Sequence, residues 1–165
     1  REEVISGLAL DILSNSQGEL FVGGINPSDI KQKGFGDCYF LVGLSALAER
    51  PQRIRDIFLK QEVDKHLYFA CTMMLRGRWQ AIYVDQKFPL QKKKYKGEYG
   101  AYEVHESTLG AVLEKAWSKL YGSYYIAEGG FTEEALHDLT GAHIRYANTR
   151  GAFFDKEKTW ERLLE

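Results

Sequence analysis

The chain has 165 residues, which is the length of one domain or of one domain and the edge of a second. It is 44% hydrophobic and 13% aromatic with only three prolines, which supports a substantial core and argues against disorder. Its 22 basic and 23 acidic residues leave a formal net charge of -1, so there is no electrostatic basis for a nucleic-acid partner or for an anionic membrane surface.

The two cysteines, Cys38 and Cys71, are too few for a disulfide framework or a four-cysteine zinc site. Free thiols are typical of a reducing compartment, so we expect a cytoplasmic location. No apolar run approaches the ~18 to 20 residues that a membrane span needs, and no signal-peptide pattern opens the chain. Because the first residue is Arg1, we expect the sequence to be a piece of a longer polypeptide.

The first third of the chain predicts two helices separated by a loop. Residues 2–13 place their apolar side chains on one face at helical spacing. Residues 14–29 are polar and glycine-rich, which predicts a loop. Residues 38–49 are apolar on nearly every side, which predicts a buried central helix that ends before Pro51. Its length and its two alanines favour a helix over a buried strand.

The middle of the chain predicts a short helix followed by a hairpin. Residues 52–60 have the pattern of a short helix. Residues 67–75 and 79–84 are rich in aromatic and β-favouring side chains, and the intervening Arg-Gly-Arg predicts the turn. Residues 85–103 are charged and rich in tyrosine. Their three consecutive lysines, Lys92, Lys93 and Lys94, indicate a solvated loop or edge, with a nucleic-acid patch as the alternative.

The last third is mainly helical. Residues 108–121 form the clearest amphipathic helix, and the Ala-Glu-Gly-Gly of residues 127–130 interrupts the pattern. Residues 131–142 predict a short helix with acidic residues in its first turn, and residues 155–165 begin another helix. Helices dominate around a small antiparallel sheet, so the predicted fold class is α+β.

The stretch QKGFGDCYF, residues 32–40, carries the chemistry. If the buried helix begins at Cys38, the free amides of its first turn and the helix dipole stabilise a thiolate there. Gly34 and Gly36 permit a sharp turn and leave room for a substrate backbone. The side-chain amide of Gln32 and the Cys38 backbone N–H are positioned to donate to an oxyanion, as in papain-type cysteine proteases. On these residues alone, a small core cysteine remains the alternative.

The segment QKGFGDCYFLVGLSALAERP resembles the active-site segment of the calpain family, the calcium-dependent papain-like proteases. IYVDQKFPL and LEKAWSKLYGSYYIAEGGFTEEALHDLTGA resemble later family motifs in the same order, so the resemblance covers roughly residues 22–142. It departs at Ala142, where the family usually has glycine, and across residues 86–107. The resemblance implies a papain-like protease half, with the Cys-bearing first subdomain at residues 1–141 and the truncated beginning of the second at 142–165.

By this resemblance, Cys38 is the nucleophile and Gln32 the oxyanion-hole glutamine. Asp37 matches the acid that precedes the nucleophile, and we expect it to cap the helix. The implied function is the Cys-bearing part of an intracellular, calcium-regulated cysteine endopeptidase that acts on protein substrates. The alternative is a non-catalytic calpain-like scaffold or partner-binding module of a larger assembly. Retention of both Cys38 and Gln32 favours the protease.

A cysteine protease also needs a histidine as acid and base and a group that orients it. The chain has four histidines: His66, His105, His137 and His143. In papain-like chains the histidine follows the cysteine by ~130 to 150 residues, which lies beyond Glu165. We therefore expect the His and Asn in the remainder of the protease core, and little or no hydrolysis by this chain alone.

The family resemblance also implies a calcium site. The carbonyls of Val22 and Gly24 and the carboxylate of Asp29 fall at matching positions, and hard cations prefer such oxygen ligands. The matching position for the acidic ligand is Ser107, and the adjacent Glu106 is the candidate substitute. The alternative is that Asp29 only caps or ends its loop.

Overall fold

The computed structural model describes residues 5–8, 20–21, 24–30, 36–60, 68–85, 87–95, 98–104, 108–152 and 154–164. The elements follow in chain order as β1 (Ile5–Leu8), η1 (Pro27–Asp29), α2 (Cys38–Ala48), α3 (Pro51–Arg55), β2 (Phe58–Lys60), β3 (Tyr68–Leu75), β4 (Arg78–Asp85), β5 (Lys87–Tyr95), β6 (Glu98–Val104), α4 (Thr108–Tyr121), α5 (Tyr124–Ala127), α6 (Thr132–Thr140) and α7 (Lys156–Leu164). None of the helices in these ranges is long and apolar enough to cross a membrane.

The described strands form two three-stranded antiparallel sheets, ordered β2–β3–β4 and β1–β5–β6. β3 and β4 pair along their whole length, from Tyr68 opposite Asp85 to Leu75 opposite Arg78. The turn between them places Arg76 at φ 52° and Gly77 at φ 74°, in the left-handed conformation that closes a tight hairpin. The predicted hairpin is confirmed.

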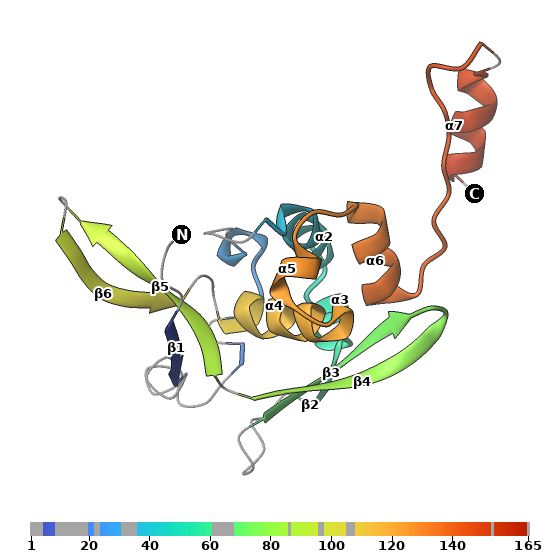
Figure 1. Ribbon diagram of the computed structural model, residues 1–165. Coiled ribbons are helices and arrows are strands. Elements are labelled where there is room, and N and C mark those ends of the chain that lie inside the picture. The colour runs from blue at the N-terminus through green and yellow to red at the C-terminus, as the bar shows by residue number, and fades with distance from the viewer. Residues whose placement is uncertain are drawn as a thin grey trace.

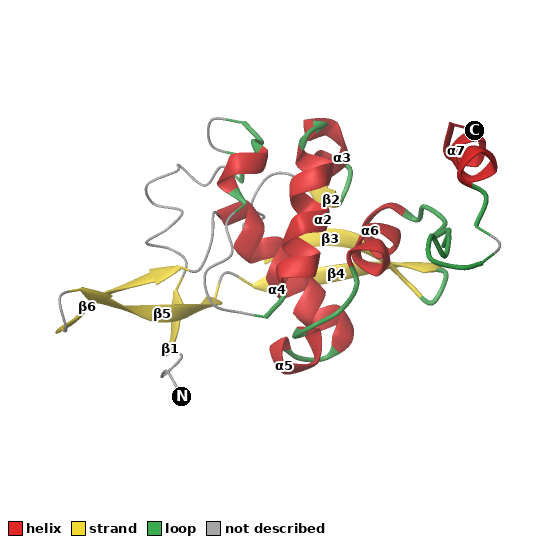
Figure 2. Ribbon diagram, turned by 90° about the horizontal axis from the view of Figure 1, so that it is seen from above, coloured by secondary structure: helices red, strands yellow, loops and turns green. Residues whose placement is uncertain are grey.

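The helices form a layer on one face of the β2–β3–β4 sheet. α4 packs on β3 and β4, α6 packs on β3, and α2 lies against α6 (Figures 1 and 2). The β1–β5–β6 sheet extends to one side of this layer (Figure 1). At the other side α7 stands apart from the layer, at the end of an extended segment, and buries none of its described side chains. The α+β class is confirmed.

The core is centred on α2, as the sequence predicted. Phe40 and Leu44 of this helix are fully buried. The Phe40 ring stacks on the indole of Trp117 from α4, with ring centroids 4.6 Å apart and planes inclined by 25°. Offset stacking suits the charge distribution of aromatic rings and adds about 0.5 to 1.5 kcal/mol to the free energy gained by burying them. This contact fixes α2 to α4, so the helix that begins at Cys38 is anchored near its first turn.

The helix predicted for residues 2–13 is wrong where the structure describes this segment. Ile5–Leu8 is the strand β1, which pairs with β5 in a register that places Ile5 opposite Leu90. A β-branched isoleucine and Gly7 weaken a helix here. Pairing with β5 supplies hydrogen bonds for the backbone of β1. These bonds to a distant strand outweigh the preference for a helix that the local apolar spacing indicates.

Two further predictions need correction. Where the structure describes residues 87–95 and 98–104, they are not a loop but the strands β5 and β6, which pair with each other. Their tyrosines favour strands. Their many charged residues are more typical of a solvated loop, and for this reason a loop was predicted. The helix predicted for residues 52–60 ends at Arg55, after which β2 places Phe58 opposite Cys71 of β3. The remaining predicted helices, in residues 108–121, 131–142 and 155–165, correspond to α4, α6 and α7.

The Trp117 contact predicts a large loss of stability on truncation. Trp117 is 2% exposed, and Trp117→Ala should lower the free energy of unfolding by about 3 to 5 kcal/mol, measured by denaturant titration. Trp160→Ala is the matched control, because that indole is 58% exposed on α7 and its removal should change stability by about 0.5 kcal/mol or less. Equal losses in the two variants would contradict this account of the core.

Candidate active site around Cys38

Cys38 is the first residue of α2, and its side chain is exposed. The backbone N–H groups of Phe40 and Leu41 donate to the Asp37 carbonyl at 2.9 and 3.2 Å, which closes the first turn. A sulfur at this position lies beside the free amides of the first turn and the positive end of the helix dipole. The body of α2 is buried and its first residue is exposed. The sulfur is therefore accessible at the end of a helix that the core holds in place.

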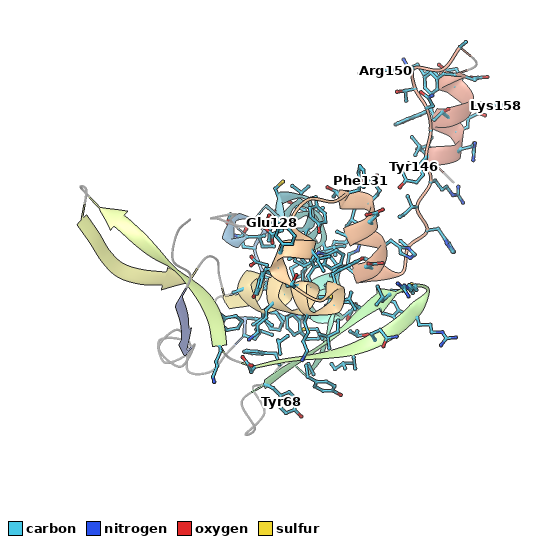
Figure 3. The ribbon with its side chains drawn as sticks, in the orientation of Figure 1. Tyr68, Glu128, Phe131, Tyr146, Arg150 and Lys158 are labelled. Carbon is cyan, nitrogen blue, oxygen red and sulfur yellow. The ribbon has the colours of Figure 1, made fainter. Side chains whose placement is uncertain are left out.

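The end of α5 and the loop that follows it hold the residues on both sides of Cys38. The Gly129 N–H donates to the Gly36 carbonyl at 2.9 Å, just before the cysteine. Just after it, the Tyr39 hydroxyl donates to the Ala127 carbonyl at 2.9 Å. The indole N–H of Trp117 in turn donates to the Tyr39 hydroxyl at 3.0 Å. Figure 3 labels Glu128 and Phe131, which flank the two glycines of this loop.

The Gly-Gly pair of this loop has a steric reason. A Cβ atom at Gly130 would lie 2.6 Å from the Tyr39 ring, which is too close for any side chain without displacing the ring. Gly129 has φ 73°, a left-handed conformation that glycine adopts without strain. From the sequence, these glycines were predicted only to interrupt the helical pattern, and Tyr39 was not among the predicted site residues. The signal was available, because an aromatic residue directly follows the cysteine.

The acid before the cysteine does not cap the helix. Asp37 makes no side-chain capping hydrogen bond, so the expectation of a cap is wrong. Asp37 is instead 3% exposed, and so is Glu114 of α4, which acts on the pKa of Asp37. Burial raises the pKa of Asp37, its own backbone N–H and Glu114 lower it, and the nearby Glu128 raises it, with a raised pKa as the net result.

The three motif segments noted in the sequence meet around α4. Glu114 of the Leu-Glu-Lys triplet faces Asp37, next to the cysteine. The neighbouring Lys115 pairs with Asp85 at the end of β4, with 2.5 Å between Nζ and Oδ1. Two adjacent residues of one helix therefore connect the Cys38 segment to the β3–β4 hairpin.

The second cysteine has a different environment. Cys71 is fully buried in β3, and burial raises the pKa of its thiol to about 12. It is therefore a neutral core side chain at physiological pH, as its apolar sequence context predicted.

The structure covers the other predicted site residues only in part. Val22, Gln32 and Glu106 lie outside the described residues, and so does Ser107. Gly24 has a left-handed φ of 100° in the loop before η1. Asp29 is the last residue of η1, whose first turn is capped by Asn26. In the described ranges no group of three or more His, Cys, Asp or Glu side chains is arranged to hold a metal ion.

The described histidines do not reach the nucleophile. The ring Nδ1 of His137 lies 2.6 Å from the Ala142 carbonyl, beyond the end of α6, and His143 is exposed on the extended segment that follows. Among the residues that the structure describes, neither histidine hydrogen-bonds to Cys38.

A cavity of about 700 Å³ lies at the opposite end of α2. Leu47, Trp79 and Leu136 are among its lining residues. Leu47 is nine residues after Cys38, which corresponds to about 14 Å along a helix. This cavity is therefore separate from the surroundings of the exposed thiol.

Comparison with known proteins agrees with this geometry. The sequence pattern of the family described as "Calpain family cysteine protease" matches residues 9–165. The chain belongs to the calpain family. The resemblance predicted from the cysteine segment and the later motifs is thus confirmed.

Among the calpain relatives, the calpain-type cysteine protease ADL1 of Oryza sativa subsp. japonica is 34% identical over 136 residues, which is 82% of this chain and 6% of that protein. DEK1 of Arabidopsis thaliana, also a calpain-type cysteine protease, is 34% identical over 155 residues, or 92% of this chain and 7% of that protein. Human calpain-12 is 31% identical over 117 residues, or 69% of this chain and 16% of that protein. The chain thus spans a small part of each relative.

The two thiols should differ in reactivity. With iodoacetamide at neutral pH, Cys38 should be alkylated in the folded chain, while Cys71 should react at least about 100-fold more slowly because it is buried and neutral. Mass spectrometry of the separated peptides gives both rates, and denaturant should make the two rates similar. Equal labelling of both cysteines in the folded chain would contradict the assignment of Cys38 as the accessible thiol.

Proposed function

We propose that this chain is the nucleophile-bearing part of a calpain-type cysteine endopeptidase core. The observation that supports this most directly is the exposed Cys38 at the first residue of the buried helix α2, in a chain of this protease family. In the proposed reaction the Cys38 thiol passes its proton to a histidine of the remaining core, and the resulting thiolate attacks the scissile carbonyl carbon. The histidine then gives this proton to the leaving amine as the peptide C–N bond breaks, and water releases the acyl group from the sulfur in a second step.

Two donors of this chain stabilise the oxyanion in the proposed mechanism. One is the backbone N–H of Cys38, whose position is supported by the hydrogen bonds of Gly36 with Gly129 and of Tyr39 with Ala127. The other is the side-chain amide of Gln32, assigned by family resemblance. Donors held in place before the reaction need no reorganisation when negative charge develops, and each contributes a large share of the rate enhancement.

We also propose that residues 1–141 form the first subdomain of the core and residues 142–165 begin the second. Two features support this boundary. α6 ends at Gly141 with φ 72°, a typical left-handed helix end. The chain beyond it, which carries Tyr146, Arg150 and Lys158, leads away from the helical layer (Figure 3). The partners of this chain are then the remainder of the core, with its His and Asn, and protein substrates in the cytoplasm.

The proposed calcium site uses the carbonyls of Val22 and Gly24 with the carboxylates of Asp29 and Glu106. All four are hard oxygen donors, which suit calcium. A bound ion here would hold the loop that precedes Gln32 and the start of α4 together.

The catalytic proposal predicts that the full-length protein cleaves casein. Cys38→Ala should reduce cleavage to background, and Gln32→Ala should lower kcat by about 100- to 1,000-fold because one oxyanion donor is lost. The 165 residues alone should be inactive. Cysteine-dependent cleavage by this chain alone would disprove the placement of the histidine elsewhere. A full-length protein that neither cleaves casein nor reacts with a thiol-directed activity probe would favour the scaffold alternative.

The calcium proposal predicts heat of binding when the full-length protein is titrated with calcium in a calorimeter. Asp29→Ala should remove the part of the heat due to this site, because the carboxylate is its only full charge from the η1 segment. Asp155→Ala is the control, because it removes an exposed carboxylate from the N-terminus of α7. Identical heats for the wild-type protein and Asp29→Ala would count against the site.

A further inference from the structure

The hydroxyl group of Tyr39 lies between a donor and an acceptor from two different helices. It accepts a hydrogen bond from the indole N–H of Trp117 on α4 at 3.0 Å. It donates to the carbonyl of Ala127, the last residue of α5, at 2.9 Å. A carbonyl at the end of a helix has no partner within that helix, so the hydroxyl supplies a bond that α5 cannot form by itself.

Both residues that bond to this hydroxyl are buried. Ala127 is 4% exposed and Trp117 is 2% exposed. A buried polar group that loses its partner is left without a hydrogen bond and without water to replace it. Loss of the hydroxyl alone therefore costs one donor and one acceptor their partner, while the edge-to-face contact between the Tyr39 and Trp117 rings remains.

The segment that follows Ala127 is also bonded to the chain before the nucleophile. Two residues after Ala127, the Gly129 N–H donates to the Gly36 carbonyl at 2.9 Å. Gly36 lies two residues before Cys38, and Tyr39 lies directly after it. The two hydrogen bonds hold residues 127–129 against the chain on both sides of the sulfur. A shift of this segment is therefore transmitted to the Cys38 backbone N–H, the proposed oxyanion donor.

The Tyr39 ring limits the position of the next residue in the same segment. A Cβ atom at Gly130 would lie 2.6 Å from the Cε2 and Cζ atoms of this ring, and Cζ carries the hydroxyl. The backbone at Gly130 thus packs directly on the ring. The ring sets how closely the segment approaches α2, and the hydroxyl bond sets its position along the ring.

We propose that Tyr39 is a positioning residue, whose hydroxyl group keeps residues 127–129 where they fix Gly36 and the Cys38 backbone for catalysis. The hydroxyl acts through this segment and not on the reacting atoms. The catalytic role rests on the proposed protease function, whereas the hydrogen-bonded connection from Trp117 to Gly36 does not.

Tyr39→Phe tests the proposal, because it removes the hydroxyl and keeps the ring. In the full-length protein, kcat for cleavage of labelled casein should fall by about 10-fold, because small displacements of reacting groups cost large factors in rate. KM should stay within about 2-fold, because no group placed against the substrate is removed. A kcat equal to that of the wild-type protein would overturn the positioning role.

Tyr121→Phe is the matched control. The Tyr121 ring also contacts Trp117, with centroids 4.8 Å apart, but its hydroxyl donates to the Asp138 carboxyl on α6. Its loss should lower the urea midpoint of unfolding at least as much as Tyr39→Phe, because a carboxyl group is the stronger acceptor. It should nevertheless leave kcat within about 2-fold. Equal losses of kcat in the two variants would indicate a general effect of stability and overturn the positioning role.

Gly130→Ala displaces the same segment by a different route. Its methyl group would press on the Tyr39 ring, so kcat should fall by about 10-fold or more. Gly43→Ala is the control, because the added Cβ would meet Leu136 at an ordinary contact distance of 3.6 Å and should leave kcat unchanged. A wild-type kcat in Gly130→Ala would also overturn the positioning role.

Hydrogen exchange tests the connection without any activity. In the full-length protein, the Gly129 amide should exchange about 10-fold faster in Tyr39→Phe and at the wild-type rate in Tyr121→Phe, measured by mass spectrometry of the peptide that contains it. Unchanged exchange in Tyr39→Phe would overturn the connection. If the full-length protein does not cleave casein but exchange accelerates as expected, the proposed function and the positioning role fail together, and the connection stands.

Discussion

The stacking of Phe40 on Trp117 is the contact on which the candidate site depends. It joins the helix that begins at Cys38 to the amphipathic helix α4, near the first turn of the former. The same indole donates through its N–H to Tyr39, and Tyr39 reaches the loop that also holds Gly36. Trp117 therefore supports Tyr39 and Phe40, the two residues after the cysteine, while Gly129 holds Gly36 before it. Together these contacts fix the position of the exposed sulfur.

Polar groups behind the cysteine complete this arrangement. Adjacent residues of α4 extend in two directions, with Glu114 toward the start of α2 and Lys115 toward the end of β4. A further buried acid, Asp138 of α6, accepts a hydrogen bond from the hydroxyl of Tyr121 at the end of α4. Buried polar contacts of this kind are directional, so they restrict the relative rotation of packed helices more than apolar contacts do.

The sequence was sufficient to predict an element or a site residue where a strong local pattern agreed with the tertiary fold. The apolar run from Cys38 predicted α2 because its length and its two alanines favour a buried helix over a buried strand. The hairpin was predictable because Gly77 closes a tight turn between two aromatic-rich runs. The thiol, its glycine-rich turn and the family motifs together indicated the chemistry.

The sequence was insufficient to predict the structure of a residue where that structure depends on a contact with a residue far away along the chain. β1 is a strand because β5 pairs with it, and no pattern within a few residues encodes that partner. Asp37 has the residue type of a helix cap, yet its carboxyl is directed inward to α4. The steric need for Gly130 could not be deduced without the position of the Tyr39 ring. In each case a contact between residues that are distant in the sequence decides the structure.

The placement of the three tryptophans has a practical consequence for spectroscopy. Trp117 is enclosed beside the cysteine helix, Trp79 is half-exposed at the distant cavity, and Trp160 is exposed on α7. Indole fluorescence shifts to longer wavelength as the ring meets water, so each tryptophan reports on a different region. Replacing Trp79 and Trp160 with phenylalanine would leave one intrinsic fluorophore that senses the support of the nucleophile.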